Sequence, residues 1–320
     1  MTEIIPRDIF KVRLPLPFRL DHVNCYAVKG RDGWTIVDAG LNYDPARKAW
    51  LEFMDRYGFD AGEITGIYIT HYHPDHYGAA GWLQQLSGAP VYMSSVDAAL
   101  ADKIWKQGRR NMELLSRMYL ENGVPAGLIT KMLDNIMDMR SMVTPHPDIT
   151  ILSGEEEVRL GDRYFRVVST PGHSDGHVCF YNKESGILLS GDHLLPDITS
   201  NISLWPQSHP NPLDNFLTSL AENRRLKISL ALPAHGECFT NVDQRLAELE
   251  EHHRDRLNVI KRATSRGASA YQACMDVFGS GLSLHEMRFA LTETMAHLVY
   301  LEKRGELRLN LDGNVYKYSI

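Results

Sequence analysis

The chain has 320 residues, of which 43% are hydrophobic and 23% are charged, the proportions of an ordinary folded protein and not of a disordered one. Its formal net charge of −6 argues against general affinity for nucleic acids or anionic membranes. The start of the chain lacks a basic segment followed by an apolar run, and no later segment is apolar for the roughly 18 residues of a membrane span. The four cysteines are scattered, so we expect a cytoplasmic protein without a disulfide framework or a cysteine zinc site.

The N-terminal part of the chain alternates between strand and helix patterns. Predicted strands cover residues 10–14, 23–28, 34–37, 64–70 and 90–93. Predicted helices cover residues 44–56, where Pro45 occupies the first turn, and residues 78–86. The alternation predicts a layered α/β domain that opens with a meander.

Residues 96–143 show helical patterns alone, divided into two or three helices by Gly108, Gly123 and Pro125. Six of the twelve methionines lie in this insert. Because methionine is flexible and polarizable, surfaces rich in it adapt to varied apolar ligands. We consider two roles for the insert, which spans about residues 96–145. It is either a helical lid that accepts an acyl or other apolar chain, or a subdomain packed around its own core.

Strand patterns return after the insert. They cover residues 149–152, 157–160, 164–169, 178–181, 186–190 and 230–232. A helix is predicted over residues 216–226. Two meandering sheets, each followed by helices, indicate a sandwich with helices on its outer faces, which we assign to residues 1–245.

The C-terminal part, residues 246–320, has a different pattern. Helices are predicted over residues 244–262, 268–278 and 289–304, and a hairpin over 306–310 and 314–318 that turns at Asp312-Gly313. Helices followed by a hairpin look like a winged-helix module. The last helix carries Glu293, His297 and Glu302, with basic residues only at its end. We therefore predict a structural role, or a dimerising role in a homodimer, in preference to DNA binding.

One short motif organises the chain. Three histidines and one aspartate, His71, His73, Asp75 and His76, fall within six residues directly after a predicted strand. If the loop then opens a helix, His71 and His73 lie on one side of a turn, and Asp75 and His76 begin the next turn. The four side chains then cannot readily share one tetrahedral ion, so two adjacent metal ions fit better. Imidazole and carboxylate ligands without thiolate suit zinc, and tolerate manganese, iron or cobalt.

Three further candidates stand at predicted strand ends: His173 in Pro-Gly-His-Ser, Asp192 in Ser-Gly-Asp-His, and His235 in Pro-Ala-His-Gly. Together with the first motif, they resemble the metallo-β-lactamase fold hydrolases, in particular the branch that includes glyoxalase II, lactonases and ribonuclease Z. The resemblance covers about residues 10–245 and is interrupted only by the insert. It implies a four-layer αβ/βα sandwich, with the helical insert and a small winged-helix-like domain added.

The resemblance also implies roles for these residues. One metal would be bound by His71, His73 and His173, and a second by Asp75, His76 and His235. Asp192 would bridge the two ions, two Zn²⁺ or alternatively Mn or Fe, and a hydroxide would bridge them on the other side as the nucleophile. Asp75 and Asp192 are the candidate catalytic residues, and Asp75 would orient the hydroxide and pass a proton to the leaving group.

Neighbouring residues receive more modest roles. Asp38 matches a family position near the site, where it would support a ligand histidine, although it is also an ordinary turn residue. His177 and His193 flank ligands but are not predicted to be ligands. The remaining candidates are predicted bystanders: His22, His146, His209, Glu237, His252, His253, His285 and His297.

Three functions remain open. The first is hydrolysis of thioesters or related esters, such as acyl-coenzyme A, acyl-glutathione or acyl-carrier conjugates, which the apolar insert and the acidic charge favour. The second is phosphodiester cleavage of RNA, for which Arg109, Arg110, Arg117, Lys131 and Arg140 would have to supply a basic groove. The third is binding without catalysis, which the occupation of all seven ligand positions argues against. Lactonase activity of the usual type is disfavoured because Leu195 stands where many lactonases have tyrosine.

Overall fold

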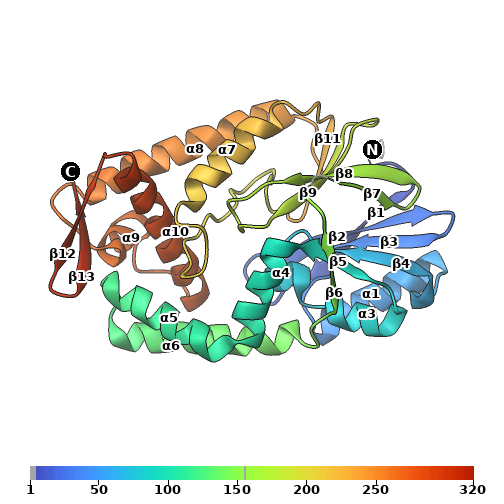
Figure 1. Ribbon diagram of the computed structural model, residues 1–320, viewed down its shortest axis with the longest axis horizontal. Helices are drawn as coiled ribbons and strands as arrows, with labels where there is room; N and C mark the ends of the chain where they lie inside the picture. Colours follow the sequence, from blue (N-terminus) through green and yellow to red (C-terminus); the bar gives the residue numbers. More distant parts are fainter. Residues whose placement is uncertain (1–4, 155) are drawn as a thin grey trace.

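The computed structural model describes residues 5–154 and 156–320 (Figure 1). Residues 1–4 at the start of the chain, which entered the expectation of a cytoplasmic protein, lie outside the described residues. The first sheet has six strands in the order β1-β2-β3-β4-β5-β6. Their bounds are β1 Ile9–Pro15, β2 His22–Gly30, β3 Gly33–Val37, β4 Ile64–Tyr68, β5 Val91–Ser94 and β6 Ile149–Leu152.

The pairing in this sheet is mixed. β1, β2 and β3 are antiparallel, so the predicted opening meander is confirmed. From β3 onward the neighbouring strands are parallel, which corrects the expectation of a meander throughout. The physical reason is that a helical crossover follows β3, β4 and β5, and such a connection returns the chain in the same direction.

The second sheet has five strands in the order β11-β10-β9-β8-β7. Their bounds are β7 Glu157–Leu160, β8 Arg163–Ser169, β9 Val178–Asn182, β10 Ile187–Gly191 and β11 Leu230–Pro233. The first four strands form an antiparallel meander, as predicted. β11 is parallel to β10, because α7 (Pro212–Asn223) connects them.

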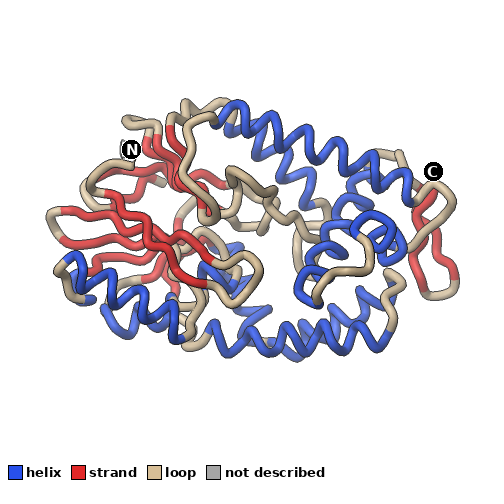
Figure 2. Tube along the Cα trace, turned by 180° about the vertical axis from the view of Figure 1, so that it is seen from behind, coloured by secondary structure: helices blue, strands red, loops and turns tan. Residues whose placement is uncertain are grey.

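Helices cover the outer face of each sheet (Figure 2). α1 (Asp44–Tyr57) and α3 (Ala80–Ser87) pack on the first sheet, and α1 buries Ala46, Trp50, Phe53 and Met54 at helical spacing. α7 and α8 (Val242–Ala263) pack on the second sheet. A third core lies between the two sheets. The four-layer αβ/βα sandwich is therefore confirmed.

The insert leaves the sandwich after β5 and consists of several helices. They are α4 (Ser95–Ala101), a π-helical turn (Asp102–Lys106), α5 (Gly108–Glu121), α6 (Ala126–Met139) and a 3-10 turn (Arg140–Val143). In Figure 1, α5 and α6 run along the lower edge toward the C-terminal hairpin. Their buried residues, among them Leu115 and Met132, share one core with Leu291 and Met295 of the C-terminal part. The insert is thus not packed around a core of its own.

The C-terminal part has the predicted order of helices and hairpin. After α8 come α9 (Ala270–Phe278), α10 (Leu284–Lys303), β12 (Arg308–Asp312) and β13 (Val315–Ser319). The predicted boundary between residues 245 and 246 falls inside α8, and the division into two domains and the winged-helix assignment stay predictions. α10 is buried on most sides and packs among α6, α7, α8 and α9, so it has no free face for a nucleic-acid groove. Among the described residues, no helix is both long and apolar enough to cross a membrane.

Candidate metal centre

Four strand ends bring the predicted site residues to one edge of the sandwich. β4 leads into the loop of His71 and His73, and the short helix α2 (Pro74–Tyr77) follows with Pro74 in its first turn. The loops after β8, β10 and β11 supply the remaining candidates. All seven predicted residues lie together: His71, His73, Asp75, His76, His173, Asp192 and His235.

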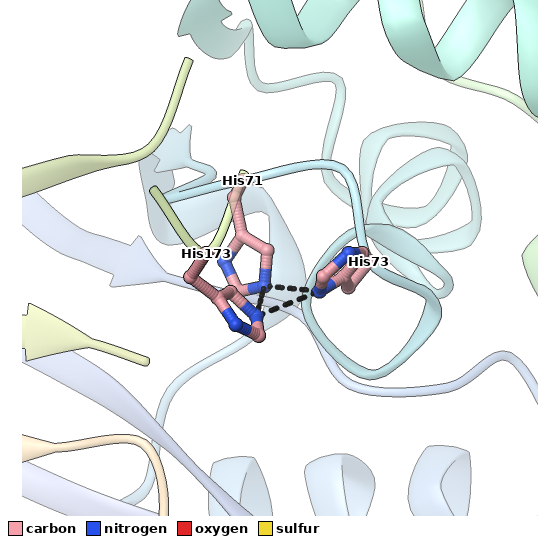
Figure 3. Close-up of side chains that lie close together, drawn as sticks. All are labelled: His71, His73 and His173. Carbon is pink, nitrogen blue, oxygen red and sulfur yellow. Dashed lines mark hydrogen bonds between the residues drawn. The ribbon is translucent and has the colours of Figure 1, made fainter. Parts of the chain in front are cut away.

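The first group of side chains, here called the tri-histidine group, consists of His71, His73 and His173. Figure 3 shows their rings turned toward one another. His71 Nε2 lies 3.0 Å from His73 Nδ1 and 3.2 Å from His173 Nε2, and His73 Nδ1 lies 2.8 Å from His173 Nε2. Three nitrogens therefore meet around one point.

The outer nitrogens of two of these rings are already occupied. His71 Nδ1–H donates to Thr70 Oγ1 at 3.0 Å, and His173 Nδ1–H donates to the carbonyl of Asn201 at 2.8 Å. The two Nε2 atoms then carry lone pairs that face each other, and a shared cation would remove their repulsion. The tri-histidine group thus fits a metal ion of the zinc type.

The second group, here called the carboxylate-rich group, consists of Asp75, His76 and His235. His76 Nδ1–H donates to Asp38 Oδ2 and His235 Nδ1–H donates to the carbonyl of His22, both at 2.8 Å. Their Nε2 atoms therefore point inward as acceptors. His76 Nε2 is buried and has no hydrogen-bond partner among the described residues, as expected of a metal ligand.

Asp192 lies between the two groups. Its Oδ1 is 3.4 Å from His76 Nε2 and 3.3 Å from His235 Nε2, while its Oδ2 is 3.3 Å from His173 Nε2. One carboxylate oxygen thus faces each group. This is the arrangement that a bridging carboxylate requires.

The two groups differ in their protonation. Burial, together with the neighbouring histidines, lowers the pKa of His71 and His73 well below its usual range, and burial also lowers the pKa of His173. Burial alone would lower the pKa of His235 as well, but Asp192 and Asp75 outweigh it and raise the pKa to about 10. Burial would also lower the pKa of His76, but the carboxylates of Asp192, Asp38 and Asp75 outweigh it and raise the pKa well above its usual range. Without metal, the carboxylate-rich group is therefore the one that holds protons.

This difference predicts that acidification removes the two ions one after the other. Protons compete for His76 and His235 throughout the range below their raised pKa, whereas the tri-histidine group is protonated only below its lowered pKa. Between pH 7.5 and pH 5.5, affinity at the carboxylate-rich group should fall by about tenfold per proton per pH unit. Metal content after dialysis should drop from two ions per chain to one, and simultaneous loss of both ions would contradict the assignment.

Asp38 forms hydrogen bonds with His76 and with Thr70, the neighbour of His71, as the sequence suggested. Its Oδ1 accepts the backbone N–H of Thr70 at 2.8 Å, and its carboxylate also accepts the Thr70 hydroxyl and His76 Nδ1–H. It adopts φ +63°, an uncommon conformation for a residue other than glycine. The strained turn after β3 thus holds this carboxylate beneath the histidines.

Asp97 is a supporting residue that the sequence patterns did not single out. It is fully buried at the start of α4 and accepts the Tyr72 N–H at 3.0 Å, the Ser174 hydroxyl at 2.7 Å and the Gly176 N–H at 2.7 Å. Burial raises the pKa of Asp97 to about 7, although these three hydrogen bonds oppose the shift. Asp97 therefore fastens the loop of His71 and His73 to the loop of His173.

Replacing Asp97 by asparagine is expected to loosen both loops. One acceptor oxygen becomes an amide that faces donors, and each buried donor left without a partner costs about 1–3 kcal/mol. We expect a lower thermal midpoint and weaker metal binding at the tri-histidine group, measured by calorimetry and metal titration. Asp102→Asn, a nearby surface change, is the control. Unchanged metal affinity in Asp97→Asn would contradict this role.

Three histidines outside the two groups also border the site. His177 Nε2 accepts the backbone N–H of Asp192 at 3.2 Å, so it orients Asp192 without joining either group. His193 is buried against Phe216 and also lies outside both groups. His285, expected to be a bystander, stacks on Phe18 and lines the cavity above the site.

A cavity of about 660 Å³ opens above the metal centre. His73, Asp75, His173, Asp192 and His235 lie at its floor. Its walls are mainly apolar and come from the insert, from the loop after β10 and from α10. The apolar wall residues include Leu100, Ile104, Trp105, Leu115, Ile136, Met139, Leu195, Trp205 and Phe289.

Comparison with known proteins agrees with this geometry. A sequence profile described as Metallo-beta-lactamase superfamily matches residues 18–235. The chain belongs to the metallo-β-lactamase superfamily. A second profile, described as Metallo-beta-lactamase-like, C-terminal domain, matches residues 257–320. Members of the superfamily bind divalent metal ions, often two, in agreement with the two side-chain groups.

Similar proteins cover nearly the whole chain. The probable metallo-hydrolase YqjP of Bacillus subtilis (strain 168) is 26% identical over 98% of each chain. The crystal structure of metallo-beta-lactamase family protein TTHA1429 from Thermus thermophilus is 30% identical, with 98% of both chains aligned and a TM-score of 0.89. A beta-lactamase domain protein from Burkholderia ambifaria is also 30% identical, with 99% of this chain and 93% of that chain aligned and a TM-score of 0.87. The protein is thus a metal-dependent hydrolase of the metallo-β-lactamase superfamily.

Proposed function

We propose that the protein hydrolyses thioesters or related esters that carry an apolar acyl chain. The observation that carries the proposal is the cavity, which has the metal centre at its floor and apolar walls above it. A buried CH₂ group contributes about 0.8 kcal/mol, so each methylene seated against these walls would raise kcat/KM roughly fourfold. A small polar substrate would leave the walls unused.

The chain would hold two divalent ions, zinc by preference and manganese or iron otherwise, between the tri-histidine group, the carboxylate-rich group and Asp192. Such ions supply a water of lowered pKa and polarise the scissile carbonyl. Burial raises the pKa of Asp75, but His76 and His235 outweigh it and hold the pKa at about 2. Asp75 is therefore ionised at the cavity floor. It would accept one proton of the attacking water and return it to the leaving thiolate, so that the products are a thiol and a carboxylic acid, which releases its own proton to the solvent.

The geometry does not favour the two alternatives. In the insert, Arg109 and Arg117 pair with Glu113 and Glu121, and Arg140 donates to the carbonyls of Trp105 and Lys106. Three of the five basic side chains that would form a groove for RNA are thus already engaged within the insert. For lactones, Leu195 lines the cavity but offers no hydroxyl to a substrate carbonyl.

The test is a hydrolysis screen on metal-quantified protein. Acyl-coenzyme A, acyl-glutathione, acyl-homoserine lactone and single-stranded RNA are compared in parallel, with Asp192→Ala as the blank. Thioester turnover that grows with acyl length supports the proposal. Cleavage of RNA alone, or thioester turnover independent of acyl length, would contradict it.

A further inference from the structure

Arg288 is a buried arginine without a carboxylate partner. Only 5% of its surface is exposed, and it lines the cavity from α10. Its Nε has no hydrogen-bond partner among the described residues, and no carboxylate oxygen of that part of the chain lies within ion-pair distance. The guanidinium contacts Met139 Sδ at 3.7 and 3.8 Å and His285 Nδ1 at 3.3 Å. Thioether sulfur is a weak acceptor, and the Phe289 ring, whose centroid lies 5.0 Å from the guanidinium carbon, adds only a cation–π contact. The positive charge is therefore buried with little compensation.

The surroundings of Arg288 offer further donors instead of a counter-ion. Burial lowers the pKa of Arg288, and Tyr72, which lines the same cavity, keeps a neutral hydroxyl because burial raises its pKa. Tyr119 is fully buried, and its hydroxyl has no hydrogen-bond partner among the described residues. The indole N–H of Trp205, which also lines the cavity, is buried without an acceptor in the described part of the chain. The cavity thus presents the Arg288 guanidinium and the Trp205 indole N–H as donors without acceptors in the described part of the chain, a combination that suits an anionic ligand.

The other charges of the cavity do not neutralise Arg288. The Glu286 carboxylate accepts a hydrogen bond from the Arg19 guanidinium at 3.0 Å and another from the backbone N–H of Ser283. The Asp175 carboxylate accepts a hydrogen bond from the backbone N–H of His209. Asp75 and Asp192 belong to the metal centre. An acid group has to come from outside the chain if the guanidinium is to be paired.

We propose that Arg288 binds an oxyanion of the substrate, a carboxylate or a phosphate, in the cavity above the metal centre. This inference rests on the proposed function. The substrate would then be an acyl compound with its scissile bond at the metal ions, an apolar segment along Leu115, Ile136 and Met139, and an anionic group on Arg288. Guanidinium suits this role because it pairs with carboxylate or phosphate through two parallel hydrogen bonds.

Two substrate pairs separate the possible sources of the anion. Hexanoyl and adipoyl thioesters of N-acetylcysteamine differ only in a terminal carboxylate. Hexanoyl-pantetheine and hexanoyl-4′-phosphopantetheine differ only in a phosphate of the leaving group. Wild-type protein should favour the charged member of one pair by roughly 10- to 100-fold in kcat/KM, the range of a charge-assisted hydrogen bond.

Arg288→Met should remove that preference and leave kcat/KM for neutral hexanoyl-N-acetylcysteamine unchanged. Its thermal midpoint should stay equal or rise, because a buried charge without a partner is replaced by an apolar side chain of similar length. Arg19→Met, which removes an exposed arginine at the same cavity, is the matched control and should keep the preference. Equal losses on charged and neutral substrates in Arg288→Met, or no charged preference in wild-type protein, would overturn the inference.

A binding measurement keeps the inference testable if no thioester is hydrolysed. Adipate and inorganic phosphate are added separately to metal-loaded wild-type protein and to Arg288→Met, and the thermal midpoints are compared. Binding at the metal ions affects both proteins alike, so the difference reports on Arg288. A larger rise in wild-type protein supports the anion site even if the thioesterase proposal fails, and equal rises refute it.

Discussion

Alanine in place of Asp192 is expected to lower kcat by roughly 10³-fold or more, because a bridging carboxylate contributes several kcal/mol through the charge balance of the site. Each of its oxygens faces a different histidine group, with separations of 3.3 Å to His173 Nε2 and to His235 Nε2. Removal of the carboxylate would weaken the negative charge that raises the pKa of His76 and His235, and would take away the ligand that we propose the two metal sites share. Metal content should fall below two ions per chain. Steady-state kinetics and elemental analysis of the same preparation measure both effects.

Asp197→Ala is a suitable control, because Asp197 is an exposed aspartate of the same loop. It should keep the activity and both ions. A fold check by circular dichroism separates loss of the site from loss of structure. An Asp192→Ala protein with full activity and two ions would refute the bridging role.

The site residues could be predicted because their signals are local. His71 to His76 form one compact motif after a strand, and His173, Asp192 and His235 each stand at the end of a strand. β4 of the first sheet ends at the same edge of the sandwich as β8, β10 and β11 of the second sheet, so the loops that follow these strands gather there. Their metal-binding roles stay predictions that the converging lone pairs support.

The supporting residues could not be predicted in the same way. Asp97 is a single aspartate at the start of a helix, and its partners Tyr72, Ser174 and Gly176 lie 25, 77 and 79 residues away in the sequence. His177 likewise gains its role from a contact with the backbone of Asp192 across a turn. Such contacts depend on tertiary packing, which one sequence without its fold does not reveal.

The start of α10 is marked in the sequence by a capping motif, which the apolar pattern alone does not reveal. The apolar pattern predicted a helix from residue 289, whereas α10 begins at Leu284 after the N-cap Ser283. Ser283 and Glu286 form a capping box, in which each side chain accepts the backbone N–H of the other, and this pattern is visible in the sequence. The late start left Arg288 outside the predicted helix. With the correct start, Arg288 belongs to a helix that is buried on most sides, where an arginine is conspicuous.

Because the insert and the C-terminal part share one core, deletion of the insert would also disturb the C-terminal part. Deletion of residues 98–143 would expose the buried faces of α9 and α10, including Leu291 and Met295, so it would remove more than a wall of the cavity. A point substitution in the shared core is a better test. Leu291 is fully buried there, among residues of both parts.

Leu291→Ala is expected to lower the free energy of unfolding by about 2–5 kcal/mol, the cost of a cavity left by leucine. Because α5, α6, α9 and α10 share this core, amide hydrogen exchange should rise in the insert and in the C-terminal part together, whereas the strands of the sandwich keep their protection. Leu311→Ala, an exposed leucine of the terminal hairpin, should change neither. If exchange rose in α9 and α10 while α5 and α6 kept their protection, the insert would be an independent unit. Joint loosening would instead mean that the apolar cavity wall is held by the C-terminal part, and the same variant should then lose its acyl-length preference while it still hydrolyses short activated esters.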